Sequence, residues 1–144
     1  MKKILFLIIV AFLAYSFLHE GGISIPFVPL SNSTRDGVLQ EAYNNQENGL
    51  QVEGKGVVIK TLSDDLDGSR HQRFILQLDS GQTLLIAHNI DLAPRINELM
   101  PGDKIEFYGE YEWNDKGGVI HWTHHDPSSK HVAGWLKYGG RTYQ

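Results

Sequence analysis

Hydrophobic and polar residues alternate with a period of two over most of the chain after residue 50. Between residues 70 and 79, Phe74, Leu76 and Leu78 fall on one face. Between residues 104 and 113 the apolar positions alternate in the same way with charged ones. This period is typical of a β-strand that buries one face. The pattern predicts five strands, over residues 51–62, 70–79, 82–88, 104–113 and 118–124.

The apolar spacing changes from two to three or four residues in two places, which predicts two helices. One follows Ser33 or Asp36, either of which could cap it, and presents Val38, Leu39 and Ala42 on one stripe. The other covers residues 91–100, where Pro94 would lie in the first turn.

Five short strands with a helix between the third and the fourth form the order of an OB-fold barrel. The expected fold is therefore mainly β: a small five-stranded OB-fold-like barrel with a short helix between strands 3 and 4, preceded by an N-terminal helix. A generic antiparallel barrel or sandwich remains the alternative. The tail from residue 126 to 144 carries Trp135, Leu136 and Tyr138, and is expected to fold back over one mouth of the barrel.

The chain begins with Lys2 and Lys3, followed by residues 4–18 without a charge. A basic start and an apolar stretch are typical of a secretory signal peptide or a signal anchor. Fifteen residues span only ~22 Å as a helix, which favours a cleaved signal. Against cleavage, no polar stretch precedes the small residues Ala14 and Ser16, so both alternatives stay open.

This reading divides the chain into a signal peptide or membrane anchor at 1–18, a linker at 19–33 and a single OB-fold-like domain at 34–144. The expected location is the periplasm, either free or anchored to the inner membrane, because Lys2 and Lys3 should remain cytoplasmic. Membrane contact is expected only through residues 4–18, if they are not cleaved.

Composition narrows the classes of function. The 144 residues include no cysteine, which excludes disulfides, thiol catalysis and cysteine-ligated metal clusters. The formal net charge of -4 argues against non-specific nucleic-acid binding, which needs clustered Lys and Arg. There is no Gly-x-Ser-x-Gly elbow, P-loop or Gly-x-Gly-x-x-Gly motif, so nothing supports a serine hydrolase of that type or a nucleotide cofactor.

Histidines are the clearest chemical signal in the sequence. Imidazole is the commonest metal ligand, and with a carboxylate it suits zinc or copper. The candidate metal ligands lie in one short stretch: His121, His124, His125, Asp126 and His131. The spacing matches no standard metalloprotease motif. The competing interpretation is that these histidines are hydrogen-bonded structural residues packed on tryptophans.

A second group of polar and aromatic residues could bind a ligand on the barrel surface. Arg beside His can hold a phosphate or a carboxylate. The candidate ligand-binding residues are Arg70, His71, Arg73, His88, Trp122 and Trp135. The alternative is that the arginines bind no ligand and form surface ion pairs with the abundant Asp and Glu side chains.

Several segments together resemble the uncharacterised bacterial domain-of-unknown-function 3465 family. These are residues 64–65 with 68–74, then 86–96, 109–113 and 117–127, and finally His131 with Gly134 and Trp135. The resemblance covers about residues 37 to 144. It implies a small exported bacterial protein and supplies no mechanism.

The sequence therefore favours an exported module that binds an unknown ligand at a His/Arg/Trp-lined surface. A metal-assisted, phosphodiesterase-like hydrolase that uses the histidines is the second hypothesis. A structural or protein-interaction role is the third.

Overall fold

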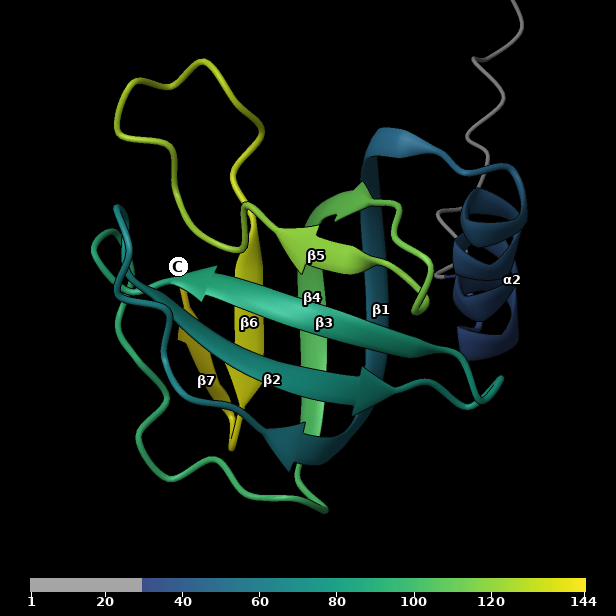
Figure 1. The fold of residues 1–144 in the computed structure, drawn as a ribbon, viewed down its shortest axis with the longest axis horizontal. Helices are drawn as coiled ribbons and strands as arrows, with labels where there is room; N and C mark the ends of the chain where they lie inside the picture. The colour runs from purple at the N-terminus through teal and green to yellow at the C-terminus, as the bar shows by residue number, and fades with distance from the viewer. Residues whose placement is uncertain (1–29) are drawn as a thin grey trace, which may run out of the picture.

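The computed structural model describes residues 30–144, and the predicted signal or anchor at 1–18 lies outside them. One helix and seven strands follow in order: α2 (Asn32–Asn44), β1 (Asn48–Thr61), β2 (His71–Gln77), β3 (Thr83–Asn89), β4 (Lys104–Glu112), β5 (Val119–His121), β6 (Trp135–Tyr138) and β7 (Arg141–Tyr143). Figure 1 shows α2 at one side of a strongly curved sheet. Between residues 30 and 144 there is no helix with the length and apolar character needed to cross a membrane.

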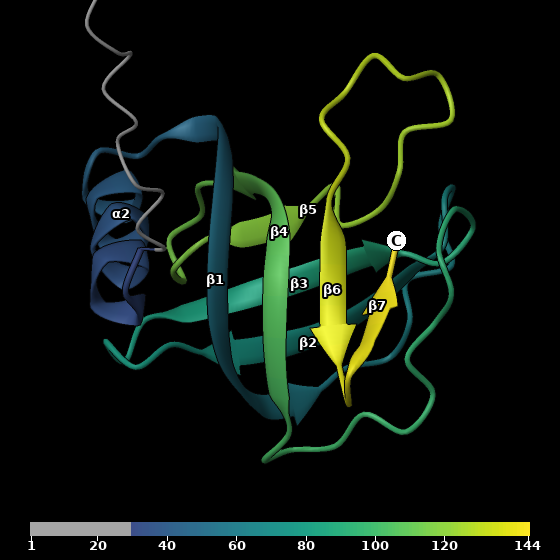
Figure 2. The same cartoon turned by 180° about the vertical axis from the view of Figure 1, so that it is seen from behind.

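The first five strands close into a barrel, which confirms the mainly β expectation. The hydrogen-bonded order is β1-β2-β3-β5-β4, and β1 also pairs with β4. All these pairings are antiparallel except β3 with β5, which is parallel. Figure 2 shows β1, β4 and β6 side by side on the face opposite β2 and β3.

The core is formed by the face that alternation assigned to the interior. Phe74, Leu76, Ile105, Phe107 and Tyr111 are completely shielded from solvent. Trp113, also expected inside, is only partly buried at the edge of this cluster.

Two glycines let β1 run unbroken through the barrel. A Cβ on Gly54 would lie 2.6 Å from the Phe107 ring, and one on Gly56 would lie 2.6 Å from the carbonyl oxygen of Gln77. Real Cβ atoms do not approach that closely, so glycine is required where the strand passes a large ring and a neighbouring backbone. The strand bends further at an irregularity between Val58 and Lys60.

The predicted helix at residues 91–100 is wrong, because this segment consists of turns and irregular backbone. Side chains occupy the groups that a helix would have used. The Asn89 side chain accepts hydrogen bonds from the backbone N–H groups of Asp91 and Leu92. Gln72 binds both backbone groups of Ile96, at 2.7 and 2.9 Å. The local Asn89 bonds compete directly with helix formation, and the Gln72 bonds from β2 engage backbone groups that a helix would have paired.

The tail forms strands instead of a cover over one mouth. β6 pairs with β4, and β7 pairs with β6, so the sheet is extended along the edge of the barrel. Leu136 is fully buried, as its apolar character suggested, and Trp135 is half-buried.

The helix α2 begins earlier than the sequence suggested. Ser31 caps it by accepting a hydrogen bond from the Thr34 N–H, so neither Ser33 nor Asp36 is the cap. Asp36 is buried and accepts a hydrogen bond from the Ser80 N–H in the β2–β3 turn at 2.9 Å. This contact and the buried Leu39 fix the helix against the barrel.

Candidate metal centre

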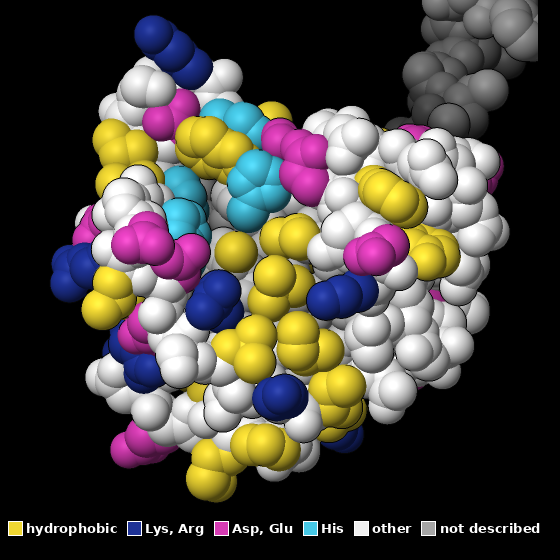
Figure 3. Space-filling view, in the orientation of Figure 1, with side chains coloured by type: hydrophobic (Ala, Val, Ile, Leu, Met, Phe, Trp, Pro, Cys, Tyr) yellow, Lys and Arg dark blue, Asp and Glu magenta, His cyan; other side chains and the backbone are white. Residues whose placement is uncertain are grey.

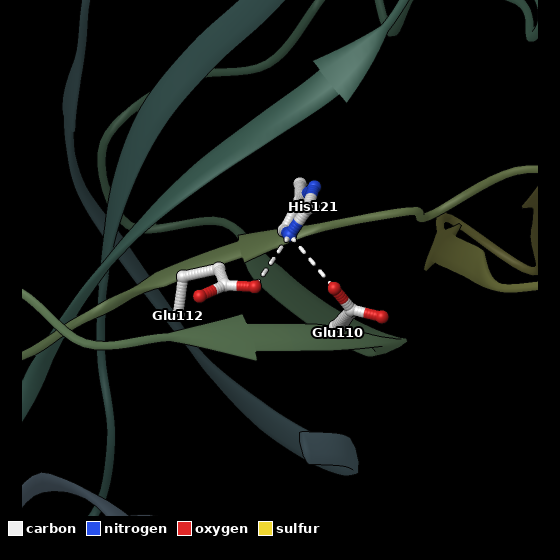
Figure 4. Close-up of side chains that lie close together, drawn as sticks. All are labelled: Glu110, Glu112 and His121. Atoms are coloured by element: carbon white, nitrogen blue, oxygen red, sulfur yellow. Dashed lines mark ion pairs between the residues drawn. The ribbon is translucent and has the colours of Figure 1, made fainter. Parts of the chain in front are cut away.

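Two neighbouring strands bring two carboxylates and one imidazole together on the outside of the barrel (Figure 4). Glu110 and Glu112 are two positions apart on β4, so both point outward. His121 ends β5 and is directly opposite Glu110 in the antiparallel register. One potential ligand atom from each of the three residues lies within 4.8 Å of the others.

The imidazole faces both carboxylates without a hydrogen bond to either. The Nε2 atom of His121 is 3.4 Å from an oxygen of Glu110 and 3.7 Å from an oxygen of Glu112. It is shielded from solvent and makes no hydrogen bond to any residue between 30 and 144. N–H donors normally lie 2.7–3.2 Å from an oxygen acceptor. The site therefore contains a buried polar atom whose bonding capacity is unused.

A long loop returns a second histidine to the same carboxylate. The loop at residues 122–134, yellow-green in Figure 1, stands above the barrel between β5 and β6. His131 donates from Nε2 to Glu110 at 2.5 Å and from Nδ1 to the carbonyl of Val132 at 2.8 Å. Because both ring nitrogens donate, His131 is an imidazolium in this arrangement.

Electrostatics agree with a charged His131 beside an ionised Glu110. Burial would lower the pKa of His131, but the hydrogen bonds with Glu110 and Val132 outweigh it and raise the pKa. Burial would raise the pKa of Glu110, but the His131 bond and the nearby imidazoles lower it overall. The His131 ring also stacks on Trp122, with centroids 4.0 Å apart and planes 9° from parallel. Cation–π attraction between these two rings stabilises the loop internally, while the His131–Glu110 bond attaches the loop to β4.

A family model described as "Protein of unknown function (DUF3465)" matches residues 22–144 of the chain. The chain belongs to the DUF3465 family. This confirms the resemblance carried by the His, Arg and Trp segments. No curated protein matches the chain.

In this DUF3465 member, the predicted metal ligands divide into two groups. His121 and His131 both approach Glu110, whereas the cluster does not include His124, His125 or Asp126. His124 is buried and hydrogen-bonds through Nδ1 to the carbonyl of His125, whose side chain is exposed.

Asp126 organises the loop of this DUF3465 member. Its carboxylate accepts hydrogen bonds from the backbone of Ser128, Lys130 and His131, and from the Ser128 hydroxyl. The bonds from Ser128 contribute most to holding the pKa of Asp126 far below its ordinary value. The lone pairs that would bind a metal ion are already engaged.

Strand alternation fails immediately after His121. Strict alternation through the predicted strand 118–124 would place Ile120 and Trp122 in the core and turn His121 and Thr123 away from it. Ile120 is buried as expected, but Trp122 has a φ of 53° and Thr123 is completely buried. A left-handed residue reverses the side-chain order, so Trp122 turns outward to stack on His131.

The predicted ligand-binding residues are dispersed over the DUF3465 barrel. Arg70 forms an ion pair with Asp91 at 2.6 Å. His71 donates from Nδ1 to the carbonyl of Ser69, and Arg73 donates to the carbonyl of Ser63. Trp135 lies on β6 against Tyr108.

Figure 3 shows histidines gathered with acidic side chains at one end of the face formed by β2, β3 and β5.

His88 points into the barrel and does not line its surface. It is completely buried, with Nδ1 at 2.8 Å from the Thr123 hydroxyl and Nε2 at 3.1 Å from the carbonyl of Pro94. Burial lowers the pKa of His88 to about 4, and the nearby His124 and His71 act in the same direction. This histidine is therefore neutral and serves the fold.

Sequence reasoning missed Glu110 and Glu112 as candidate ligands. The alternation of residues 104–113 had placed both on the outward face, where glutamates are ordinarily solvent-exposed surface residues. The available signal was the pairing of β4 with β5, since consecutive antiparallel strands bring an outward His opposite an outward Glu.

Proposed function

We propose that this DUF3465 chain is an exported metal-binding module. Glu110, Glu112 and His121 would hold one divalent transition-metal ion on the surface of an OB-fold-like barrel. The observation that carries the proposal is the His121 Nε2 atom, shielded and unbonded between two carboxylates.

The distances favour a metal ion over a direct ion pair. Zinc bonds to imidazole nitrogen and carboxylate oxygen are ~2.1 Å long, so tetrahedral ligands lie ~3.4 Å apart. The measured separations of Nε2 from Glu110 and Glu112 are 3.4 and 3.7 Å. A protonated His121 would instead move onto one carboxylate, as His131 does on Glu110. Mixed nitrogen and oxygen ligands suit zinc, copper or nickel.

The OB-fold-like assignment rests on topology. The closed order β1-β2-β3-β5-β4, with a parallel β3–β5 pairing, is the order of an OB barrel. The missing helix between β3 and β4 is a departure from that pattern. Export rests on Lys2, Lys3 and the uncharged residues 4–18.

The proposal is tested by thermal unfolding of metal-free protein at pH 7.5, with and without zinc, copper or nickel. A metal that binds only the folded state stabilises it by ~2.7 kcal/mol at a hundredfold excess over Kd. We expect one of these metals to raise Tm, and Glu112→Gln and His121→Ala to abolish the rise. His125→Ala removes an exposed histidine outside the cluster and should retain it.

A rise that survives in both cluster variants, or no rise with any of the three metals, would contradict the metal centre. A large loss of Tm in metal-free His121→Ala, without any metal response of the parent protein, would instead support the structural interpretation of the histidines.

A metal-assisted phosphodiesterase is a second candidate function, favoured by the number of ligands. Catalytic zinc sites keep three protein ligands and leave one position for water. Here the cluster supplies three residues, each with 18–38% of its side chain exposed. Metal-dependent hydrolysis of bis(p-nitrophenyl) phosphate that is lost in Glu112→Gln would establish it. Metal binding without hydrolysis would contradict the phosphodiesterase and leave metal binding as the only function supported.

A further inference from the structure

A groove with a surplus of positive charge lies at the other end of β4. It encloses about 540 Å³ between β1, the start of β4 and the β6–β7 hairpin. These elements lie side by side in Figure 2, where the hairpin tip and the start of β4 are at the same end. Its charged lining residues are Lys55, Asp79, Lys104, Glu106, Lys137 and Arg141.

Within the described residues 30–144, no ion pair neutralises the four cations. Among residues 30–144, none of them has a carboxylate partner within 4.0 Å. Glu106 lies between Lys55 on β1 and Lys137 on β6 in the strand register, yet contacts neither at that distance. Two carboxylates face four cations, so the groove carries a positive surplus on a chain whose net charge is negative.

Aromatic rings lie beside two of these four cations. The Lys137 ammonium lies 4.1 Å from the centre of the Trp135 ring, and the Arg141 guanidinium lies 5.6 Å from that of Tyr143. The hairpin tip consists of Gly139 and Gly140, with φ values of 55° and 76°. Glycine suits this turn, and without side chains the tip leaves its backbone open to a ligand.

We propose that this groove binds a small anion that carries two or more phosphate groups. Its volume lies within the range of small-molecule sites, ~300–1,000 Å³. Lysine and arginine are the residues that bind phosphate in proteins, through a point charge and a planar fork of donors respectively. A cleft with a surplus of positive charge also raises the local concentration of such an anion.

The groove is independent of the proposed metal centre. Lys104 and Glu110 are six positions apart on one strand, which corresponds to ~20 Å. No residue of the metal cluster lines the groove. Failure of one proposal therefore leaves the other standing.

The test is calorimetric titration of the purified chain with pyrophosphate in 0.15 M NaCl, beside citrate and a single-stranded oligonucleotide. We expect Lys104→Gln and Arg141→Gln each to weaken pyrophosphate binding at least tenfold. Glu106→Gln should strengthen it, because a carboxylate between two lysines is removed. Lys116→Gln and Lys130→Gln change lysines outside the groove and should leave the affinity within twofold. Unfolding curves of all five variants check that the barrel is intact.

Three outcomes would overturn the proposal. The first is no pyrophosphate binding tighter than millimolar. The second is an equal loss in the control lysine variants, which would indicate non-specific attraction. The third is tighter binding of citrate or of the oligonucleotide, which would assign the groove to a carboxylate ligand or to a polymer.

Discussion

The two ends of β4 carry opposite chemistry on the same face of one strand. At its end, Glu110 and Glu112 meet two histidines. At its beginning, Lys104 joins three further cations around a groove. The inward face shows no such division, because Ile105, Phe107 and Tyr111 are equally buried. Alternation therefore fixes the inward residues as one core, whereas the chemistry of the outward ones is decided by neighbouring strands.

The register supplies those neighbours. Glu110 faces His121 of β5, while Glu106, four positions earlier, faces Lys55 of β1 and Lys137 of β6. Two glutamates on the same face thus acquire different roles, as a candidate metal ligand and as a carboxylate between lysines. The strand in contact decides the role, and the residue type alone does not.

The largest expected effect comes from a substitution in the buried core, which lies beneath both ends of β4. Replacing Phe107 by Ala should cost ~3–5 kcal/mol of unfolding free energy, because its ring is fully buried against Gly54 and cannot be replaced by inward movement of a side chain there. Both the metal response and the anion binding should weaken together in this variant.

Urea denaturation measures the loss, with Glu106→Gln as the matched control on the next position of the strand. Glu106 is exposed, so that substitution should change stability by less than ~0.5 kcal/mol. A loss below about 1 kcal/mol for Phe107→Ala would show that the two faces of β4 are assigned wrongly.

The next largest effect is the dependence of folding stability on pH. It sets the pH range in which the two ends of β4 can be compared in a folded protein. The folded state holds the pKa of His88 at about 4, against an ordinary histidine value of 6.5. The unfolded chain therefore binds an extra proton between these values, and stability falls as pH falls. The loss from His88 should be about 2 kcal/mol between pH 7.5 and 5, and about 3 kcal/mol by pH 4.

His88→Gln should remove this share of the pH dependence, as measured by denaturation at pH 7.5, 6 and 5. His131 acts in the opposite direction, since its raised pKa gives stability that is present at low pH and lost as pH rises. Its partly exposed pair with Glu110 should contribute less than about 1 kcal/mol. An unchanged pH slope in His88→Gln would show that this ring does not control acid stability.

The sequence predicted the barrel because strand alternation has a local cause that needs no knowledge of partners. Phe74, Leu76, Ile105 and Phe107 could be assigned to one core from spacing alone. The segment 91–100 failed for the opposite reason. Its backbone is fixed by Gln72 and His88, whose side chains come from other strands, and no local pattern reveals such contacts.

The candidate site could be predicted only in part, because residue type is visible in the sequence and contacts between strands are not. Histidines stand out by residue type, so His121 and His131 were named, but His88 was placed on the surface although it is buried. Glu110 looked like any exposed acid until its pairing with His121 was known. The backbone at Trp122 is left-handed and redirects the loop. Because the residue is not a glycine, the sequence contains no signal of this conformation.

The smallest expected effect is the coupling between the two ends. A divalent ion bound at Glu110 would be ~20 Å from Lys104, whereas the Debye length at 0.15 M salt is ~8 Å. Metal loading should therefore change pyrophosphate affinity by less than about twofold at this salt concentration. At 0.01 M salt the Debye length is ~30 Å, and loading should strengthen pyrophosphate binding measurably because a positive charge is added. The two titrations, each with and without metal, use Glu112→Gln as the control in which loading cannot occur. A strong effect at 0.15 M salt would mean that the strand transmits a structural change, and the two ends would have to be treated as one site.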